Sequence, residues 1–139
     1  MVSRSGDLPP RLVDELCRAA RAVQANAYAP ASNFRVGAAV LADDGRVFSG
    51  CNVENASYGL TICAERAAVC AAVAAGVRAI AAVAVVTDVL EPVRPCGACR
   101  QVLAEFGPRM PVILTGTSGA PMTLKLDDLL PDPFTFGRE

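Results

Sequence analysis

Apolar residues repeat at helical spacing in three parts of the chain. Residues 10–28 carry one apolar face, residues 63–75 are rich in alanine, and residues 97–106 end at a Gly-Pro pair. Gly76 follows the second segment and is expected to cap it, because glycine readily adopts the left-handed conformation that ends helices. The pattern predicts three helices, and Asp127 is expected to cap a last helical turn near the end of the chain.

The remaining apolar segments have the length of strands. Residues 80–87 form a continuous Val-rich run, which is typical of a strand that is covered on both faces and lies centrally in its sheet. The turn Asp43-Asp44-Gly45, with glycine placed for a positive φ, predicts that the first two strands form an antiparallel hairpin. The predicted strands are residues 34–42, 46–53, 80–87, 112–115 and 122–126.

The order of these elements, α-β-β-α-β-α-β-β, predicts one sheet with helices packed on it. The hairpin together with the helical crossovers excludes a purely parallel sheet. We predict an α/β three-layer sandwich in which helices cover a mixed five-stranded sheet, formed by residues 1–139 as a single domain. Because the second and third helices each follow a strand, their N-termini are expected to emerge at the same end of the sheet.

The composition is that of a soluble globular domain, with 53% hydrophobic and 19% charged residues. Thirteen Lys and Arg nearly balance fourteen Asp and Glu, so the chain lacks the surplus of cations that binds a phosphate backbone. We therefore expect a small-molecule substrate and no nucleic acid. Gly76 and Arg78 interrupt the most apolar stretch, and the N-terminus lacks the apolar run of a secretory signal, so we expect no membrane and a cytoplasmic protein.

The chain has six cysteines and no histidine. Without histidine, Ser-His-Asp and Cys-His nucleophilic sites and histidine acid–base catalysis are excluded. A reducing cytoplasm argues against disulfides, so metal binding or catalysis is the favoured role for some of the cysteines. The others are expected to be small apolar core residues.

Three cysteines and a glutamate stand at the starts of the second and third predicted helices. Cys96 and Cys99 form a C-x-x-C pair at a loop-to-helix junction, and Cys63 precedes Glu65 by two residues on the other helix. A helix N-terminus favours the thiolate, and three thiolates would leave one position of a tetrahedral zinc ion open to water. Glu65 is placed beside that position as a proton carrier. The pattern indicates a catalytic zinc site.

Other interpretations of these residues stay open at this point. A C-x-x-C pair alone is also typical of a redox site, or of half of a structural site with four cysteines. Cys70 lies roughly 10 Å along the helix from Cys63 and cannot share its ion, whereas Cys17 and Cys51 remain candidates for a fourth ligand. Glu65 by itself could be an exposed carboxylate at a helix start.

The chain resembles the small homotetrameric, zinc-dependent cytidine deaminases. Zinc deaminases share a His or Cys ligand followed by x-Glu, and then Pro-Cys-x-x-Cys, which Cys63, Glu65, Cys96 and Cys99 match. Further segments match in family order across residues 28–134, namely FRVGAAVL, GCNVENASYG, TICAER, PCGACRQVLAEFG and LLPDPF. The resemblance implies a cytidine deaminase-like fold and one Zn²⁺ per subunit. It also implies hydrolysis of cytidine and deoxycytidine to uridine and deoxyuridine plus ammonia, as in pyrimidine salvage.

The resemblance assigns roles to individual residues. Glu65 would carry protons from water to N3 and to the leaving amine, the backbone of Ala64 would contact the base, and Phe34 would pack on the pyrimidine. Asn52 and Glu54 match residues that bind the ribose 3′-hydroxyl, and alternate residues of a strand face the same side, so both could reach it. The structural alternatives are a core position for Phe34 and solvent-facing strand-end positions for Asn52 and Glu54.

Two further assignments concern charge, and two concern assembly. Zinc with three thiolates has a net negative charge, which weakens it as a Lewis acid. Arg66 resembles a residue that hydrogen-bonds the thiolates and offsets this charge, and Gln101 resembles a weaker partner, although both could be ordinary surface residues. Phe134 matches an aromatic residue that family tetramers insert into a neighbouring subunit's pocket, with local packing as the alternative. Tyr58 resembles a residue at subunit contacts.

Two departures from the family pattern raise rival functions. Ala31 stands where the family commonly has Tyr, so we expect the subunit interface there to differ. The ending of the chain, with Phe136, resembles the blasticidin S deaminases. A deaminase of a nucleoside antibiotic is therefore the nearest rival, although the complete CNVEN segment favours a ribose-bearing substrate. A structural zinc module and a polynucleotide-editing deaminase are more distant alternatives. Intact Glu65 argues against the former, and the balanced charge argues against the latter.

Overall fold

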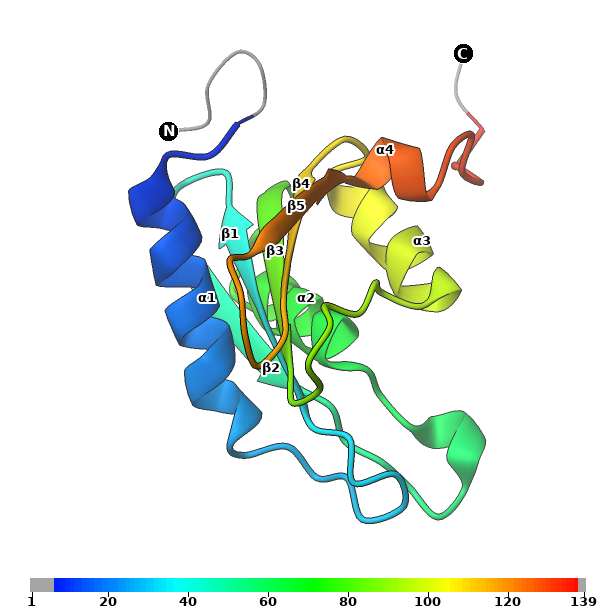
Figure 1. Ribbon diagram of the computed structural model, residues 1–139. Coiled ribbons are helices and arrows are strands. Elements are labelled where there is room, and N and C mark those ends of the chain that lie inside the picture. Colours follow the sequence, from blue (N-terminus) through cyan, green and yellow to red (C-terminus); the bar gives the residue numbers. More distant parts are fainter. Residues whose placement is uncertain (1–6, 138–139) are drawn as a thin grey trace.

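The computed structural model describes residues 7–137. In this part of the chain one mixed sheet has helices on both of its faces (Figure 1). None of the helices there is long and apolar enough to cross a membrane. The elements are α1 (Pro10–Gln24), β1 (Val36–Ala42), β2 (Val47–Cys51), the 3₁₀ turn η1 (Tyr58–Leu60), α2 (Ala64–Ala74), β3 (Ile80–Thr87), α3 (Gly97–Phe106), β4 (Pro111–Thr115), β5 (Met122–Lys125) and α4 (Leu126–Leu129).

The sheet has the strand order β2-β1-β3-β4-β5. β1 pairs antiparallel with β2 and β3, β3 pairs parallel with β4, and β4 pairs antiparallel with β5. The Val-rich β3 lies at the centre and is buried along almost its whole length, as its apolar run predicted. The mixed five-stranded sheet of the predicted α/β fold is confirmed.

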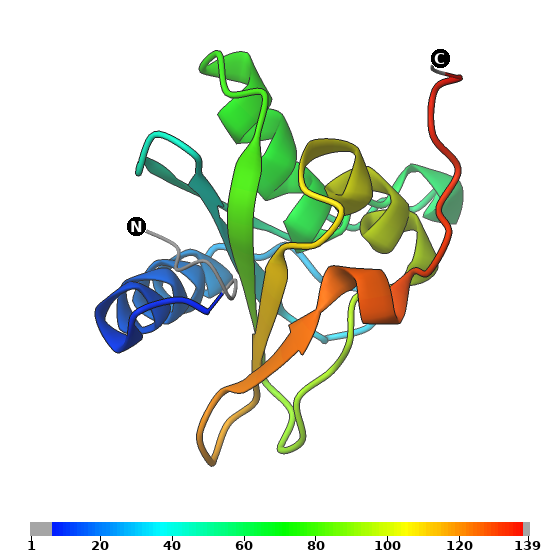
Figure 2. The ribbon, with the colours of Figure 1, turned by 90° about the horizontal axis from the view of Figure 1, so that it is seen from above.

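The helices form separate layers on the two faces of the sheet (Figure 2). α1 packs on one face through Leu12, Leu16 and Ala20. α2 and α3 pack on the other face, over a larger core that includes Val83 and Val85 of β3. Because consecutive strand residues point to opposite faces, β3 contributes to both cores.

Two glycines let the helices lie directly on the sheet. A Cβ atom on Gly37 of β1 would overlap the carbonyl oxygen of Ala20 in α1. A Cβ atom on Gly50 of β2 would lie 2.5 Å from the backbone nitrogen of Ala68 in α2. Any larger residue at either position would push a helix away from the sheet.

The end of α1 differs from the prediction. The helix ends at Gln24 rather than near Tyr28, because Tyr28 pairs with Val53 in an isolated bridge instead of continuing the helix. The predicted turn and cap glycines behave as expected, since Gly45 and Gly76 have φ angles of 95° and 98°.

The start of α4 also differs from the prediction. The helix begins at Leu126, with Lys125 in the N-cap position and no side-chain cap, so the predicted capping role of Asp127 is wrong. The chain enters this helix two residues earlier, directly from β5, which leaves Asp127 inside the first turn. One carboxylate oxygen of Asp127 is buried there without a hydrogen-bond partner.

Candidate metal centre

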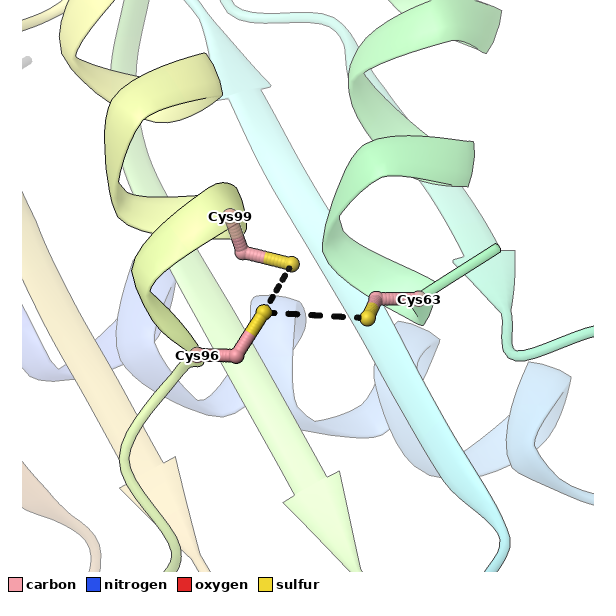
Figure 3. Close-up of side chains that lie close together, drawn as sticks. All are labelled: Cys63, Cys96 and Cys99. Carbon is pink, nitrogen blue, oxygen red and sulfur yellow. Dashed lines mark hydrogen bonds between the residues drawn. The ribbon is translucent and has the colours of Figure 1, made fainter. Parts of the chain in front are cut away.

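The starts of α2 and α3 bring three cysteine side chains together, as Figure 3 shows. Cys63 and Cys96 are the N-cap residues of α2 and α3, and Cys99 lies in the first turn of α3. Both N-cap residues are extended, and neither side chain caps its helix through a hydrogen bond. Their sulfur atoms are therefore available to a common ligand beside the helix N-termini.

The three sulfur atoms have the spacing of zinc ligands. The Sγ atoms of Cys63 and Cys96 are 3.9 Å apart, those of Cys96 and Cys99 are 3.5 Å apart, and all three lie within 4.8 Å of one another. Zinc–sulfur bonds of about 2.3 Å at tetrahedral angles place two sulfurs about 3.8 Å apart. Within residues 7–137 no other group of this kind occurs, and neither Cys17 nor Cys51 belongs to it. The fourth cysteine ligand that the sequence left open is not found.

Neighbouring groups favour a thiolate at Cys63. A hydrogen bond with Cys99 is the largest effect, and Nη2 of the Arg66 guanidinium donates to Cys63 Sγ at 3.5 Å. These contacts lower the pKa of Cys63 to about 5. The contact with Cys63, together with burial, raises the pKa of Cys99. In the metal-free cluster the first negative charge therefore forms on Cys63.

Arg66 is held in place by a second contact. Its Nη2 atom also donates to the carbonyl oxygen of Thr61 at 3.3 Å, while its Nε atom is buried without a hydrogen-bond partner. The contact between Arg66 and a cysteine sulfur is the arrangement that the resemblance implied, and it excludes the ordinary surface position as the alternative.

Glu65 lies in the first turn of α2 and is only 5% exposed. Burial is the main cause that raises the pKa of its carboxyl group, and the neighbouring Cys63 thiolate raises that pKa further. A carboxyl group with a raised pKa is suited to take up and return protons near neutral pH. The alternative of an exposed helix-start carboxylate is wrong, because the side chain is buried.

A cavity of about 220 Å³ adjoins the cysteine cluster. It is formed by the start of β1, the end of β3, the start of α2 and the loop before α3. Drug-sized ligands usually occupy about 300–1,000 Å³, so a cavity of this size suits a single small ring. Its lining is Phe34, Val36, Asn52, Thr61, Ile62, Cys63, Ala64, Glu65, Val85, Thr87, Val93, Arg94 and Cys96.

Phe34, Asn52 and Ala64, which the resemblance assigned to substrate binding, line this cavity together. Asn52 is 8% exposed, so it is not a solvent-facing residue. Its Oδ1 accepts a hydrogen bond from Val36 N at 2.9 Å, and its Nδ2 donates to Phe34 O at 2.8 Å. The carboxamide thus fixes the segment that carries Phe34 and keeps one N–H and one lone pair for a ligand. Ala64 begins α2, where a backbone N–H has no partner within the helix.

Glu54 lies outside the lining of this cavity. Its carboxylate accepts hydrogen bonds from Ala31 N at 2.8 Å, from Ser32 N at 3.2 Å and from the Ser32 hydroxyl. The bond from the Ser32 hydroxyl is the largest of the effects that lower the pKa of Glu54. β2 ends at Cys51, so Asn52 and Glu54 follow the strand, and Val53 between them pairs with Tyr28 and Ile62 in isolated bridges.

Gln101 and Phe134 contact each other rather than the cysteine cluster. Nε2 of Gln101 donates to the carbonyl oxygen of Phe134 at 2.8 Å, so this amide anchors the C-terminal segment. The Phe134 ring is 80% exposed, which excludes local burial. It borders an open depression of about 700 Å³ between α3 and the C-terminal segment, which the cysteine cluster does not line.

Several residues that line the cavity were missed by sequence reasoning. Ile62, Val93 and Arg94 lie in loops, whose course apolar periodicity does not predict. Val85 and Thr87 come from β3. Thr87 did carry a signal, because it is the only hydroxyl side chain in an otherwise apolar strand and stands at the carboxyl end of that strand, where α/β proteins bind ligands.

Comparison with known proteins identifies similar chains. The family model of the cytidine and deoxycytidylate deaminase zinc-binding region matches residues 11–115. The cytidine deaminase of Sporosarcina psychrophila is 48% identical over 124 residues, which cover 88% of this chain and 91% of that protein. The crystal structure of cytidine deaminase from Burkholderia pseudomallei is 54% identical, with a TM-score of 0.83, and the match covers 87% of this chain and 98% of that one. Cytidine deaminase from Mycobacterium tuberculosis is 47% identical, with a TM-score of 0.75, over 88% and 97% of the two chains.

Proposed function

This chain belongs to the cytidine and deoxycytidylate deaminase family, and we propose that it hydrolyses cytidine to uridine and ammonia. The family, its fold and zinc as the cofactor are confirmed as the sequence motifs predicted. 2′-Deoxycytidine is the second proposed substrate, because a contact with the 3′-hydroxyl does not separate the two sugars.

One observation carries this proposal. Cys63 and Cys96 of the three-sulfur cluster line the same small, mostly apolar cavity as the buried Glu65. A structural zinc site has four protein ligands, whereas three ligands beside a cavity are typical of a catalytic site. The arrangement favours hydrolysis of a small ring over a purely structural metal.

Cys63, Cys96 and Cys99 would hold zinc, which would supply the Lewis acid that makes water nucleophilic at neutral pH. Glu65 is the proton carrier. Its carboxylate accepts the first proton of the attacking water and passes it to ring nitrogen N3. It then accepts the second proton from the hydroxyl group at C4 and donates it to the amino nitrogen as that group leaves. The oxygen adds at C4, the bond between C4 and the amino nitrogen breaks, and one cytidine and one water yield one uridine and one ammonia.

The other residues of the cavity orient the nucleoside. Phe34 packs on the pyrimidine, and the unpaired backbone N–H of Ala64 at the start of α2 binds an edge of the base. Asn52 uses its remaining N–H for the ribose 3′-hydroxyl. Arg66, which donates to Cys63 Sγ, withdraws negative charge from the thiolates and so strengthens the site as a Lewis acid.

Glu54 is proposed to act at the sugar end of the same nucleoside. It lines an open depression of about 390 Å³ that shares Thr61 with the cysteine-side cavity. A ring beside the cysteines would therefore extend its sugar toward Glu54. The hydrogen bonds of Glu54 with the Ser32 segment must be exchanged in part when a sugar hydroxyl binds.

We propose that the chain assembles as a homotetramer with active sites shared between subunits. Tyr58, Leu60 and Phe134 are 77%, 64% and 80% exposed, and large exposed apolar side chains mark contacts with other proteins. In such an assembly Phe134 closes the cavity of a neighbouring subunit, and Tyr58 lies at a subunit contact.

Residues 1–139 are proposed to act as one domain in the cytoplasm, on free nucleosides and without nucleic acid or membrane. The balanced charge and the small cavity support a small substrate. All six cysteines are free, which suits a reducing compartment.

Ammonia release from cytidine by the zinc-loaded protein, measured beside its Glu65→Gln variant, tests the proposed function. We expect equal amounts of uridine and ammonia from the unchanged protein, and full zinc content without turnover from the variant. Blasticidin S is tested in parallel. If the protein preferred it, blasticidin S and not cytidine would be assigned as the substrate. A zinc-loaded protein that is inactive on both would be a structural zinc module.

A further inference from the structure

One buried polar group beside the cysteine cluster lacks a partner in the protein. Thr87, the last residue of β3, is 2% exposed, and its hydroxyl oxygen makes no hydrogen bond. Buried polar groups are nearly always hydrogen-bonded, because an unmet hydroxyl loses its contacts with water and gains nothing in return. Since Thr87 also lines the 220 Å³ cavity, a molecule in that cavity is the available partner.

The alternation of β3 places Thr87 on the cysteine side of the sheet. Val83 and Val85 belong to the core beneath α2 and α3, whereas Val86 belongs to the core beneath α1. Thr87 follows the same alternation as Val83 and Val85, and it lines the cavity together with Val85 and Glu65. Thr87 therefore lines the same cavity as Glu65, the proposed proton carrier.

The position of Thr87 in the sheet determines which part of a bound nucleoside this side chain contacts. Val36 of β1 pairs with Thr87 on one side and binds Asn52 on the other, so Asn52 and Thr87 lie on opposite sides of β1. This step rests on the proposed function, in which the sugar lies toward Asn52 and ring nitrogen N3 lies toward Glu65 on α2. The opposite edge of the base, with C5 and the outer N–H of the amino group, then faces β3 and Thr87.

We propose that the Thr87 hydroxyl accepts a hydrogen bond from the exocyclic amino group of the pyrimidine and thereby orients the base in the cavity. The inner side of that amino group adjoins N3 and the Glu65 carboxyl group, so the outer N–H needs a separate acceptor. Thr87 thus contacts substrate without taking part in proton transfer.

Thr87→Val and Thr87→Ser form the matched pair that tests this contact. Valine replaces the hydroxyl by a methyl group of similar size, whereas serine keeps the hydroxyl. We expect kcat/KM for cytidine to fall about tenfold in Thr87→Val and to recover most of its value in Thr87→Ser. The same fall is expected with 2′-deoxycytidine, because the contact is with the base. Zinc content and Tm should stay at the level of the unchanged protein, and Thr87→Ala replaces Thr87→Val if the latter does not fold.

Other outcomes would overturn the proposal. If kcat/KM fell with cytidine but not with 2′-deoxycytidine, the Thr87 hydroxyl would contact the ribose 2′-hydroxyl and not the base. If kcat/KM in both variants stayed within about twofold of the value for the unchanged protein, the Thr87 hydroxyl would bind only water and not the base. An equal loss in Thr87→Val and Thr87→Ser would indicate packing rather than hydrogen bonding. Failure of the proposed function is distinguishable, because the unchanged protein would then release no ammonia from cytidine, and the contact would fall with it.

Discussion

The proposed nucleoside site has a cysteine end, beside Cys63, Cys96 and Cys99, and a sugar end, beside Glu54. The two ends differ in how the chain forms them. At the cysteine end, Glu65 and the three sulfurs come from the starts of two helices of one chain, and Arg66 already contacts Cys63. At the sugar end, Glu54 is bound to the loop of Ala31 and Ser32, and Phe134 is 80% exposed on the C-terminal segment. The folded chain by itself arranges the metal ligands, whereas we expect closure around the sugar to require rearrangement and a neighbouring subunit.

The largest effect is expected at the cysteine end, from Cys99→Ala. Cys99 is fully buried and belongs to the three-sulfur cluster, and two remaining sulfurs hold zinc much more weakly than three. We expect zinc to be lost on dialysis and uridine formation to fall to the background level. Zinc per subunit and activity are measured together. Cys70→Ala is the matched control, because Cys70 is exposed and outside the cluster, and it should change neither quantity. Full zinc content in Cys99→Ala would break the assignment of the ligands.

Arg66→Gln should have the next largest effect. It removes the positive charge that contacts Cys63 Sγ while leaving the three ligands in place. Changes of this kind next to a metal site typically reduce activity roughly 10- to 100-fold. We expect kcat to fall within that range with zinc retained, as measured by steady-state kinetics and metal analysis. Arg46→Gln, which removes an exposed arginine that pairs with Asp44 far from the cluster, is the control. An unchanged kcat and pH profile would exclude a role for Arg66 in catalysis.

Phe134→Ala sharpens the contrast from the sugar end. If a neighbouring subunit's ring closes the cavity, its removal should raise KM for cytidine about tenfold and change kcat little, because a large buried aromatic contact is lost. The steady-state parameters are compared with those of Phe136→Ala, which removes the other exposed aromatic ring of the same segment. Equal KM values for the two variants would show that the sugar end does not depend on Phe134.

The smallest effect concerns the metal-free protein. The pKa of Cys63 falls from an ordinary value of 9.0 to about 5 in the folded chain, so its thiolate stabilises the fold fully above pH 9 and not at all below about pH 5. The Tm of the metal-free protein should therefore rise between these two pH values. Cys63→Ser should show a flatter profile over the same range. A profile identical to that of the unchanged protein would mean that another group titrates.

The cysteine end could be predicted from the sequence because its geometry is local. Cys96 and Cys99 are one helical turn apart, Cys63 and Glu65 begin another helix, and the crossovers around β3 bring those two starts to one edge of the sheet. The bounds predicted for β3 and α3, from apolar length and a Gly-Pro stop, are the observed ones.

The sugar end could not be predicted to the same depth. Gln101 binds a backbone carbonyl of the C-terminal segment, and Glu54 binds the Ser32 loop, so both contacts depend on loops whose course no periodicity encodes. Tyr28 left the predicted helix for the same reason, since its bridge to Val53 joins segments far apart in sequence. Contacts of this kind become visible only when the whole chain is folded.

Gly50 bears on how this protein can be engineered. The start of α2, and with it Cys63 and Glu65, rests on the main chain of β2 at the place where a Cβ atom would lie 2.5 Å from Ala68 N. The distance between α2 and the sheet is thus set by the close approach of the helix backbone to Gly50. In a mutant library aimed at thermostability, position 50 should therefore return glycine alone, whichever substrate is used for selection.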